Sequence, residues 1–134
     1  MIGVEFSVSA FINPTVWKLE KSAQVHAIRL FAKKLGLVMP FWYVLGLALL
    51  LIETFLFRHQ SHALLLAIAS GLWVLVIVLT LIFLVPINNR LARMESSAAL
   101  EKVLSDHYRW DILHRLRVMT LIAAMVLFLI AIAC

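Results

Sequence analysis

The stretch that decides the fold is ALLLAIASGLWVLVIVLTLIFLVP, residues 63–86, which contains no charged residue. About 20 apolar residues form a helix long enough to cross the hydrocarbon layer of a membrane, so this stretch predicts a transmembrane helix. The whole chain agrees, because 64% of its 134 residues are hydrophobic and only 14% are charged. Such a composition lies far outside the range of soluble globular proteins and predicts a single integral membrane domain over residues 1–134.

Three other stretches predict further spans. Residues 36–57 carry one acid, Glu53, and residues 117–134 are shorter but continuously apolar. Residues 2–17 include the acid Glu5, and we count them because an odd number of spans would be less consistent with the positions of the two basic loops. We therefore predict an all-α fold, a bundle of four transmembrane helices.

The basic residues are segregated along the chain. Eleven of the twelve lysines and arginines fall within residues 18–34 and 90–117, and Arg58 is the exception. Basic loops tend to stay in the cytoplasm, so we expect both stretches to be cytoplasmic. The turn at 58–62 and both termini would then lie on the other side of the inner (plasma) membrane. Because the basic residues flank apolar spans, anionic lipid explains them better than nucleic acid, and we expect no nucleic-acid partner.

A short internal similarity indicates a duplication. Phe11-Ile12-Asn13-Pro14 resembles Phe83-Leu84-Val85-Pro86, and each stretch ends a predicted span and precedes a charged segment. Two hairpins with the same orientation would form a parallel repeat about an axis along the membrane normal. The sequence is therefore compatible with a bundle built from two parallel helical hairpins.

The richest polar segment precedes the last predicted span. Asp106, Trp110, His114 and Arg117 are spaced at i, i+4, i+8 and i+11, so a helix places them in one stripe. The corresponding ends of the first and third spans add four polar residues: Asn13, Asn88, Asn89 and Arg90. This cluster could orient an oxygen-rich aromatic substrate, with His114 as acid and base and Arg117 holding an oxyanion. The alternatives are a metal site and a purely structural cluster, since Trp, His and Arg favour the headgroup region.

The opposite end of the bundle carries a second candidate cluster. We expect Glu5 and Glu53 to lie at similar depth, near the turn that contains His59 and His62. An ionisable residue within a span is costly and is usually functional. Two acids and two histidines predict a divalent-metal site or a proton pathway, and the alternative is a polar turn in which Glu53 pairs with a neighbouring basic residue. The single cysteine, Cys134, excludes a Cys-based metal site within one chain.

A family resemblance rests on two motifs in the second half of the chain. The stretch Val85-Pro86-Ile87-Asn88-Asn89-Arg90-Leu91, followed by Trp110-x-x-x-His114-x-x-Arg117, resembles a family of small four-helix membrane proteins that includes the fungal anthrone oxygenases. Most bacterial members of that family have no assigned function. The resemblance implies oxidation of a polycyclic anthrone to an anthraquinone by molecular oxygen. It also implies four site residues: Asn88, Trp110, His114 and Arg117.

Three functions follow from these patterns. The first is an oxygenase or oxidoreductase that acts on a lipophilic aromatic or quinone-like substrate. The second is a non-catalytic subunit or scaffold of a larger membrane complex, because four short spans enclose little volume and expose much apolar surface. The third is a metal- or proton-binding protein that uses the acid and histidine cluster. The cofactor would be either none or a divalent metal, and the expected partners are the lipid bilayer and either a second copy of the chain or a larger complex.

Overall fold

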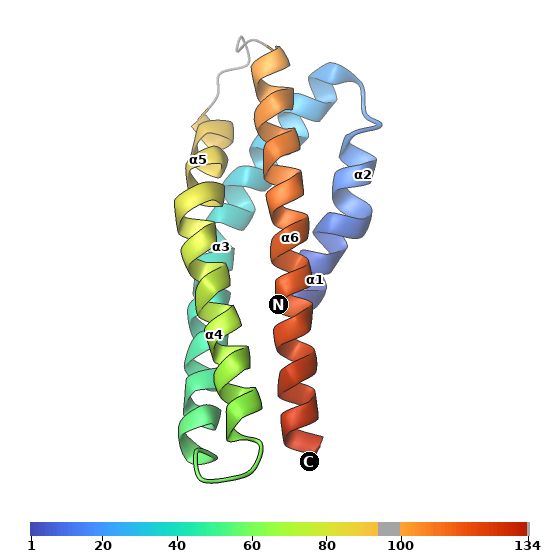
Figure 1. The fold of residues 1–134 in the computed structure, drawn as a ribbon. Helices are drawn as coiled ribbons and strands as arrows, with labels where there is room; N and C mark the ends of the chain where they lie inside the picture. Colours follow the sequence, from blue (N-terminus) through green and yellow to red (C-terminus); the bar gives the residue numbers. More distant parts are fainter. Residues whose placement is uncertain (94–99, 134) are drawn as a thin grey trace.

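The computed structural model describes residues 1–93 and 100–133, which form four helical rods side by side (Figure 1). The first rod consists of α1 (Ile2–Ser7), the π-helical turn η1 (Val8–Ile12) and α2 (Asn13–Val16). The second is α3 (Lys21–Leu56), and the third consists of α4 (Ala63–Leu79), the π-helical turn η2 (Thr80–Leu84) and α5 (Val85–Arg93). The fourth is α6 (Leu100–Ala133). The prediction of an all-α bundle is confirmed.

Three of the four rods are long and apolar enough to cross a membrane: Lys21–Leu56, Ala63–Arg93 and Leu100–Ala133. At 1.5 Å per residue they are roughly 45–55 Å long, well beyond a hydrocarbon layer of about 30 Å. The first rod is only about 22 Å long and lies beside one half of α6 (Figure 1). The protein is therefore a small membrane protein with three helical rods long enough to cross a membrane and one short rod at the predicted span 2–17.

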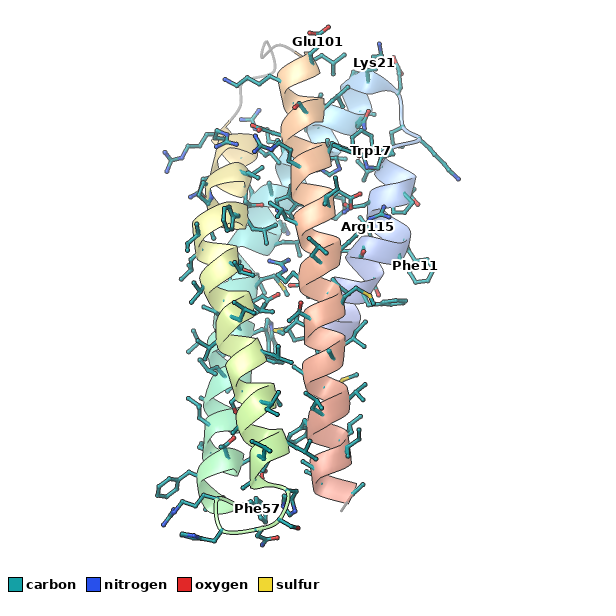
Figure 2. The ribbon with its side chains drawn as sticks, viewed as in Figure 1. Phe11, Trp17, Lys21, Phe57, Glu101 and Arg115 are labelled. Atoms are coloured by element: carbon teal, nitrogen blue, oxygen red, sulfur yellow. The ribbon has the colours of Figure 1, made fainter. Side chains whose placement is uncertain are left out.

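The ends of the rods are arranged as the charge pattern predicts. Figure 2 shows Lys21, the first residue of α3, and Glu101, in the first turn of α6, near one end of the bundle. Phe57, which follows α3, lies at the other end. The two basic stretches therefore share one end of the bundle. That this end faces the cytoplasm stays a prediction.

Two prolines follow π-helical turns in the same way. Pro14 and Pro86 each occupy the second position of an α-helix that begins where a π-helical turn ends. Proline lacks an amide hydrogen and its ring clashes with the carbonyl four residues earlier, and a wider turn relieves that clash. The two stretches that resemble each other in sequence thus share one local geometry. The hairpin repeat itself stays a prediction.

Two groups of buried apolar residues hold the rods together. One group joins the first rod, α3, α5 and α6 at the end with the basic stretches: Val16, Ile28, Ala32, Ile87, Leu91 and Val103. The other joins α3, α4 and α6 farther along the bundle: Tyr43, Trp73, Val76, Leu121 and Ala124. The space between the two groups contains the cavity described below.

Gly46 gives a direct test of the packing between α3 and α4. A Cβ atom at this position would overlap the Trp73 ring, which is buried and whose Nε1 donates a hydrogen bond to the Tyr43 carbonyl oxygen at 3.1 Å. Gly46→Ala is therefore expected to lower the free energy of unfolding by about 1–3 kcal/mol, the usual cost of overpacking. Gly71→Ala is the control, because no atom lies within 4 Å of its added Cβ and alanine favours helix. Thermal unfolding in detergent measures both variants, and equal midpoints would contradict the close contact.

Candidate functional site

A cavity of about 240 Å³ lies where all four rods face one another. Most of its wall is apolar, and its size is slightly below the range of roughly 300–1,000 Å³ typical of ligand pockets. It is therefore suited to a compact apolar ligand. Its polar side chains come from every rod: Glu5, Tyr43, Thr80, Asn88, Asn89, Trp110, His114 and Arg117.

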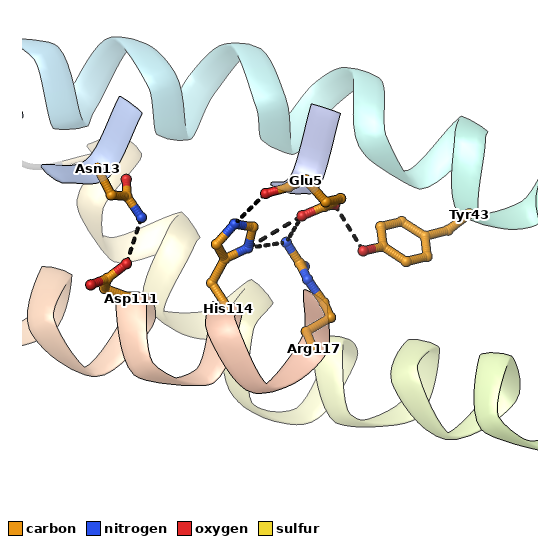
Figure 3. A network of polar contacts seen from close by, with 6 residues as sticks. All are labelled: Glu5, Asn13, Tyr43, Asp111, His114 and Arg117. Carbon is orange, nitrogen blue, oxygen red and sulfur yellow. Dashed lines mark hydrogen bonds and ion pairs between the residues drawn. The ribbon is translucent and has the colours of Figure 1, made fainter. Parts of the chain in front are cut away.

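The Glu5 carboxylate is the centre of a polar network inside this cavity (Figure 3). Only 2% of Glu5 is exposed. Its Oε2 accepts a hydrogen bond from Arg117 Nη2 at 2.7 Å, and its Oε1 accepts one from the Tyr43 hydroxyl at 2.8 Å. The Arg117 guanidinium also lies 5.5 Å from the centre of the Tyr43 ring. A carboxylate is tolerated in such a place only when it is paired and hydrogen-bonded, and these two partners meet that requirement.

His114 joins the network through both ring nitrogens. Its Nε2 lies 3.2 Å from the main-chain oxygen of Glu5, and its Nδ1 lies 2.8 Å from Arg117 Nη2 and 3.2 Å from Glu5 Oε2. In a neutral ring protonated at Nε2, Nε2 donates to the Glu5 carbonyl and Nδ1 accepts from Arg117. A ring protonated at both nitrogens can instead donate from Nδ1 to the Glu5 carboxylate. His114 can therefore take up a proton and still keep a hydrogen-bond partner for each nitrogen.

An aromatic stack fixes the orientation of the His114 ring. Trp110 stacks on His114 with ring centres 4.6 Å apart and planes at 11°. On its other side Trp110 stacks on His107, and Trp17 of the first rod lies 4.9 Å from the His107 ring centre. Because Trp110 also lines the cavity, it offers a flat apolar surface beside the polar network.

Asn88 connects α5 to α3 at the edge of the cavity. Its Nδ2 donates a hydrogen bond to the Ala32 carbonyl oxygen at 2.9 Å. The approach is close because position 36 is glycine: a Cβ there would lie 2.5 Å from Asn88 Nδ2. Asn88 and Asn89 both line the cavity, together with Trp110.

Three residues predicted for the substrate site, Asn13, Arg90 and Asp106, lie outside this cavity. Arg90 and Asp106 form a two-point ion pair between α5 and α6, with Nε–Oδ2 and Nη2–Oδ1 distances of 3.0 and 2.9 Å. Asn13 donates a hydrogen bond to Asp111 Oδ1 at 2.7 Å, and Asp111 also pairs with Arg115 on the same helix. These contacts fasten α5 and the first rod to α6, so these residues position the helices that carry the cavity.

The second predicted cluster, made of two acids and two histidines at the opposite end of the bundle, does not form. Glu5 belongs to the central network, whereas Glu53 lies about three helical turns beyond Tyr43 along α3, and the turn after α3 contains the two histidines: His59 and His62. The expectation that the two acids share a depth is wrong, because the first rod is too short to reach that turn. No group of three or more His, Cys, Asp or Glu side chains suited to a metal occurs in the part of the chain that the structure describes.

The structure thus brings together five residues predicted for the site: Asn88, Asn89, Trp110, His114 and Arg117. Sequence reasoning missed Tyr43 and placed Glu5 in the other cluster. A signal for Tyr43 was available, since a tyrosine within an apolar span needs a hydrogen-bond partner for its hydroxyl. Nothing in the sequence indicated that this partner would be Glu5.

A family model described as anthrone oxygenase matches residues 27–127. The matched range contains the cavity residues of α3, η2, α5 and α6 and excludes the first rod with Glu5. Searches of the curated proteins and of the solved structures found no match.

Proposed function

The chain belongs to the anthrone oxygenase family, and from this premise we propose that it is a membrane-embedded oxygenase that oxidises a compact, lipophilic aromatic ketone or phenol with molecular oxygen. The observation that carries the proposal is the largely apolar cavity in which Glu5, His114 and Arg117 form one buried hydrogen-bonded network. Apolar walls suit the rings of such a substrate, and a few convergent polar groups suit its oxygen.

The proposed reaction begins with removal of a proton from a carbon activated by an aromatic ketone. His114 Nδ1 accepts that proton, and the Glu5 carboxylate 3.2 Å away stabilises the resulting imidazolium. Arg117 stabilises the negative charge that develops on the substrate oxygen. The electron-rich enolate then reduces O₂. For an anthrone, the methylene carbon loses both hydrogens and gains one oxygen atom, and the second oxygen atom leaves as water.

Burial of the network favours this proposal over an interfacial cluster with only a structural role. Residues that merely anchor a helix at the headgroup region keep their polar atoms in contact with water. Here His114 is 1% exposed and Glu5 is 2% exposed, and both line a cavity. Ionisable residues within a membrane-spanning bundle are rare and usually mark a functional site, and the cavity beside these three gives a ligand a place to bind.

The test is oxidation of anthrone by the purified protein in lipid nanodiscs. We expect the protein to accelerate anthraquinone formation above spontaneous autoxidation, with one O₂ consumed per quinone formed. With ¹⁸O₂ as the oxidant, mass spectrometry should find one labelled oxygen in each quinone. A rate equal to that of empty nanodiscs, for anthrone and for hydroxylated anthrones, would contradict the proposal.

A further inference from the structure

The cavity reaches the apolar outer surface of the bundle between α3 and the rod formed by α4 and α5. On α3 three residues spaced four apart line the cavity and are also exposed on the outside: Gly36, Pro40 and Val44. The facing rod carries a matching stripe of three residues that line the cavity: Leu81, Val85 and Asn89. Leu81 and Asn89 are exposed on the outside, and Val85 is half-buried. Val44 and Leu81 are 67% and 60% exposed, although both belong to the cavity wall.

The same cavity is closed along the axis of the bundle. Toward the basic end, α3 packs against α5 through Ile28, Ala32 and Ile87. Toward the other end, Tyr43 and Trp73 pack together and are joined by the hydrogen bond from the indole. A molecule in the water on either side therefore meets packed side chains, whereas the two stripes open the cavity sideways toward the outer surface.

The residues of α3 explain why this opening exists. Gly36 has no side chain to fill the space, and Pro40 has no amide hydrogen with which to bond the Gly36 carbonyl. The surface around the opening is strongly apolar, with Leu37 82%, Phe41 64% and Ile82 58% exposed. In a membrane protein such a surface faces lipid chains.

We propose that the ligand enters this cavity sideways from the bilayer, through a slit bordered by Gly36, Pro40 and Val44 on α3 and by Leu81, Val85 and Asn89 on the facing rod. The proposal rests on the proposed function for its ligand class, a fused-ring aromatic dissolved in lipid. It adds that the slit residues control how fast that ligand arrives. Because the slit is apolar for most of its length, it also discriminates against charged, water-soluble aromatics.

The experiment compares Leu81→Trp with Ile82→Trp. The two wild-type residues are adjacent and almost equally exposed, but only Leu81 lines the cavity. Anthraquinone dissolved in nanodisc lipid is the probe, and quenching of tryptophan fluorescence gives its association and dissociation rates without any turnover. We expect Leu81→Trp to slow both rates at least about tenfold, because a blocked path affects arrival and departure alike, and Ile82→Trp to stay within about twofold of the wild type.

Val44→Trp, on the opposite border, is a second variant that should behave like Leu81→Trp. Wild-type association and dissociation rates in both border variants would overturn the proposal of entry through the slit. Equal slowing by Ile82→Trp would overturn it too. So would border variants that lose affinity for anthraquinone while the association rate stays unchanged. Slit-dependent binding without oxidation of anthrone would contradict the proposed function and leave the slit supported. If the wild type binds no anthraquinone, both proposals fail.

Discussion

Replacing Arg117 with glutamine is expected to destabilise the folded protein strongly, because the buried Glu5 carboxylate then lacks its arginine partner. Among the described residues, the Glu5 carboxylate pairs with Arg117 and His114. Without Arg117, it would keep its buried charge and lose its arginine partner. Breaking a buried ion pair from one side typically costs about 3–5 kcal/mol in the free energy of unfolding, because the remaining charge is uncompensated. Denaturation with SDS in mixed micelles measures the change.

Arg115→Gln is the matched control for this substitution. Arg115 lies two residues away on α6, its side chain is 56% exposed, and it pairs with Asp111 at 3.0 Å. Asp111 is buried but also accepts a hydrogen bond from Asn13, so its carboxylate keeps a partner when Arg115 is replaced. The Arg115 variant should therefore lose clearly less stability than the Arg117 variant. Comparable losses in the Arg115 and Arg117 variants would argue against a special role for the central network.

The double variant Glu5→Gln, Arg117→Gln tests the origin of the effect. It removes both charges and leaves two neutral amides, so it should recover much of the stability lost in the Arg117 variant. Additive losses in the double variant would mean that the two side chains do not interact. Oxidation of anthrone should remain slower in the double variant than in the wild type, because the group that stabilises the oxyanion is missing.

His114→Gln is expected to give the largest loss of activity with the least change in folding. Glutamine preserves a polar side chain of similar length but cannot accept and return a proton near neutral pH. General acid–base groups contribute about 10²–10⁴-fold to rate, and we expect kcat for anthrone oxidation to fall by that factor with a small change in KM. Kinetics in nanodiscs at saturating O₂ provide the measurement.

His107→Gln controls for the loss of a buried histidine from the same helix. His107 lies two turns away on α6, stacks on Trp110 and does not line the cavity that holds the network. Its substitution should change kcat little, although it can lower stability through the lost stacking. If the His114 variant keeps the activity of the His107 variant, His114 is not the proton acceptor.

The stripe of Trp110, His114 and Arg117 could be predicted because it depends only on the period of a helix. The spans followed in the same way from the length of the apolar runs, and Pro86 placed Asn88 and Asn89 just past the apolar part of a span. Such features are local, since each is fixed by residues within a few turns of one another. This explains why the half of the site carried by α5 and α6 was visible in the sequence.

The partner of that stripe was decided by tertiary structure. Hydropathy shows that a segment is apolar, but the depth at which a helix lies along its neighbours is set by side-chain packing between rods. The first rod is held toward the basic end, where Asn13 bonds Asp111, and Glu5 therefore lies level with His114 and Arg117 instead of near the distant turn. The same packing brings the Tyr43 hydroxyl onto Glu5. The sequence alone determined which side chains share a helix face, whereas contacts between residues about a hundred positions apart decided which of them form the site.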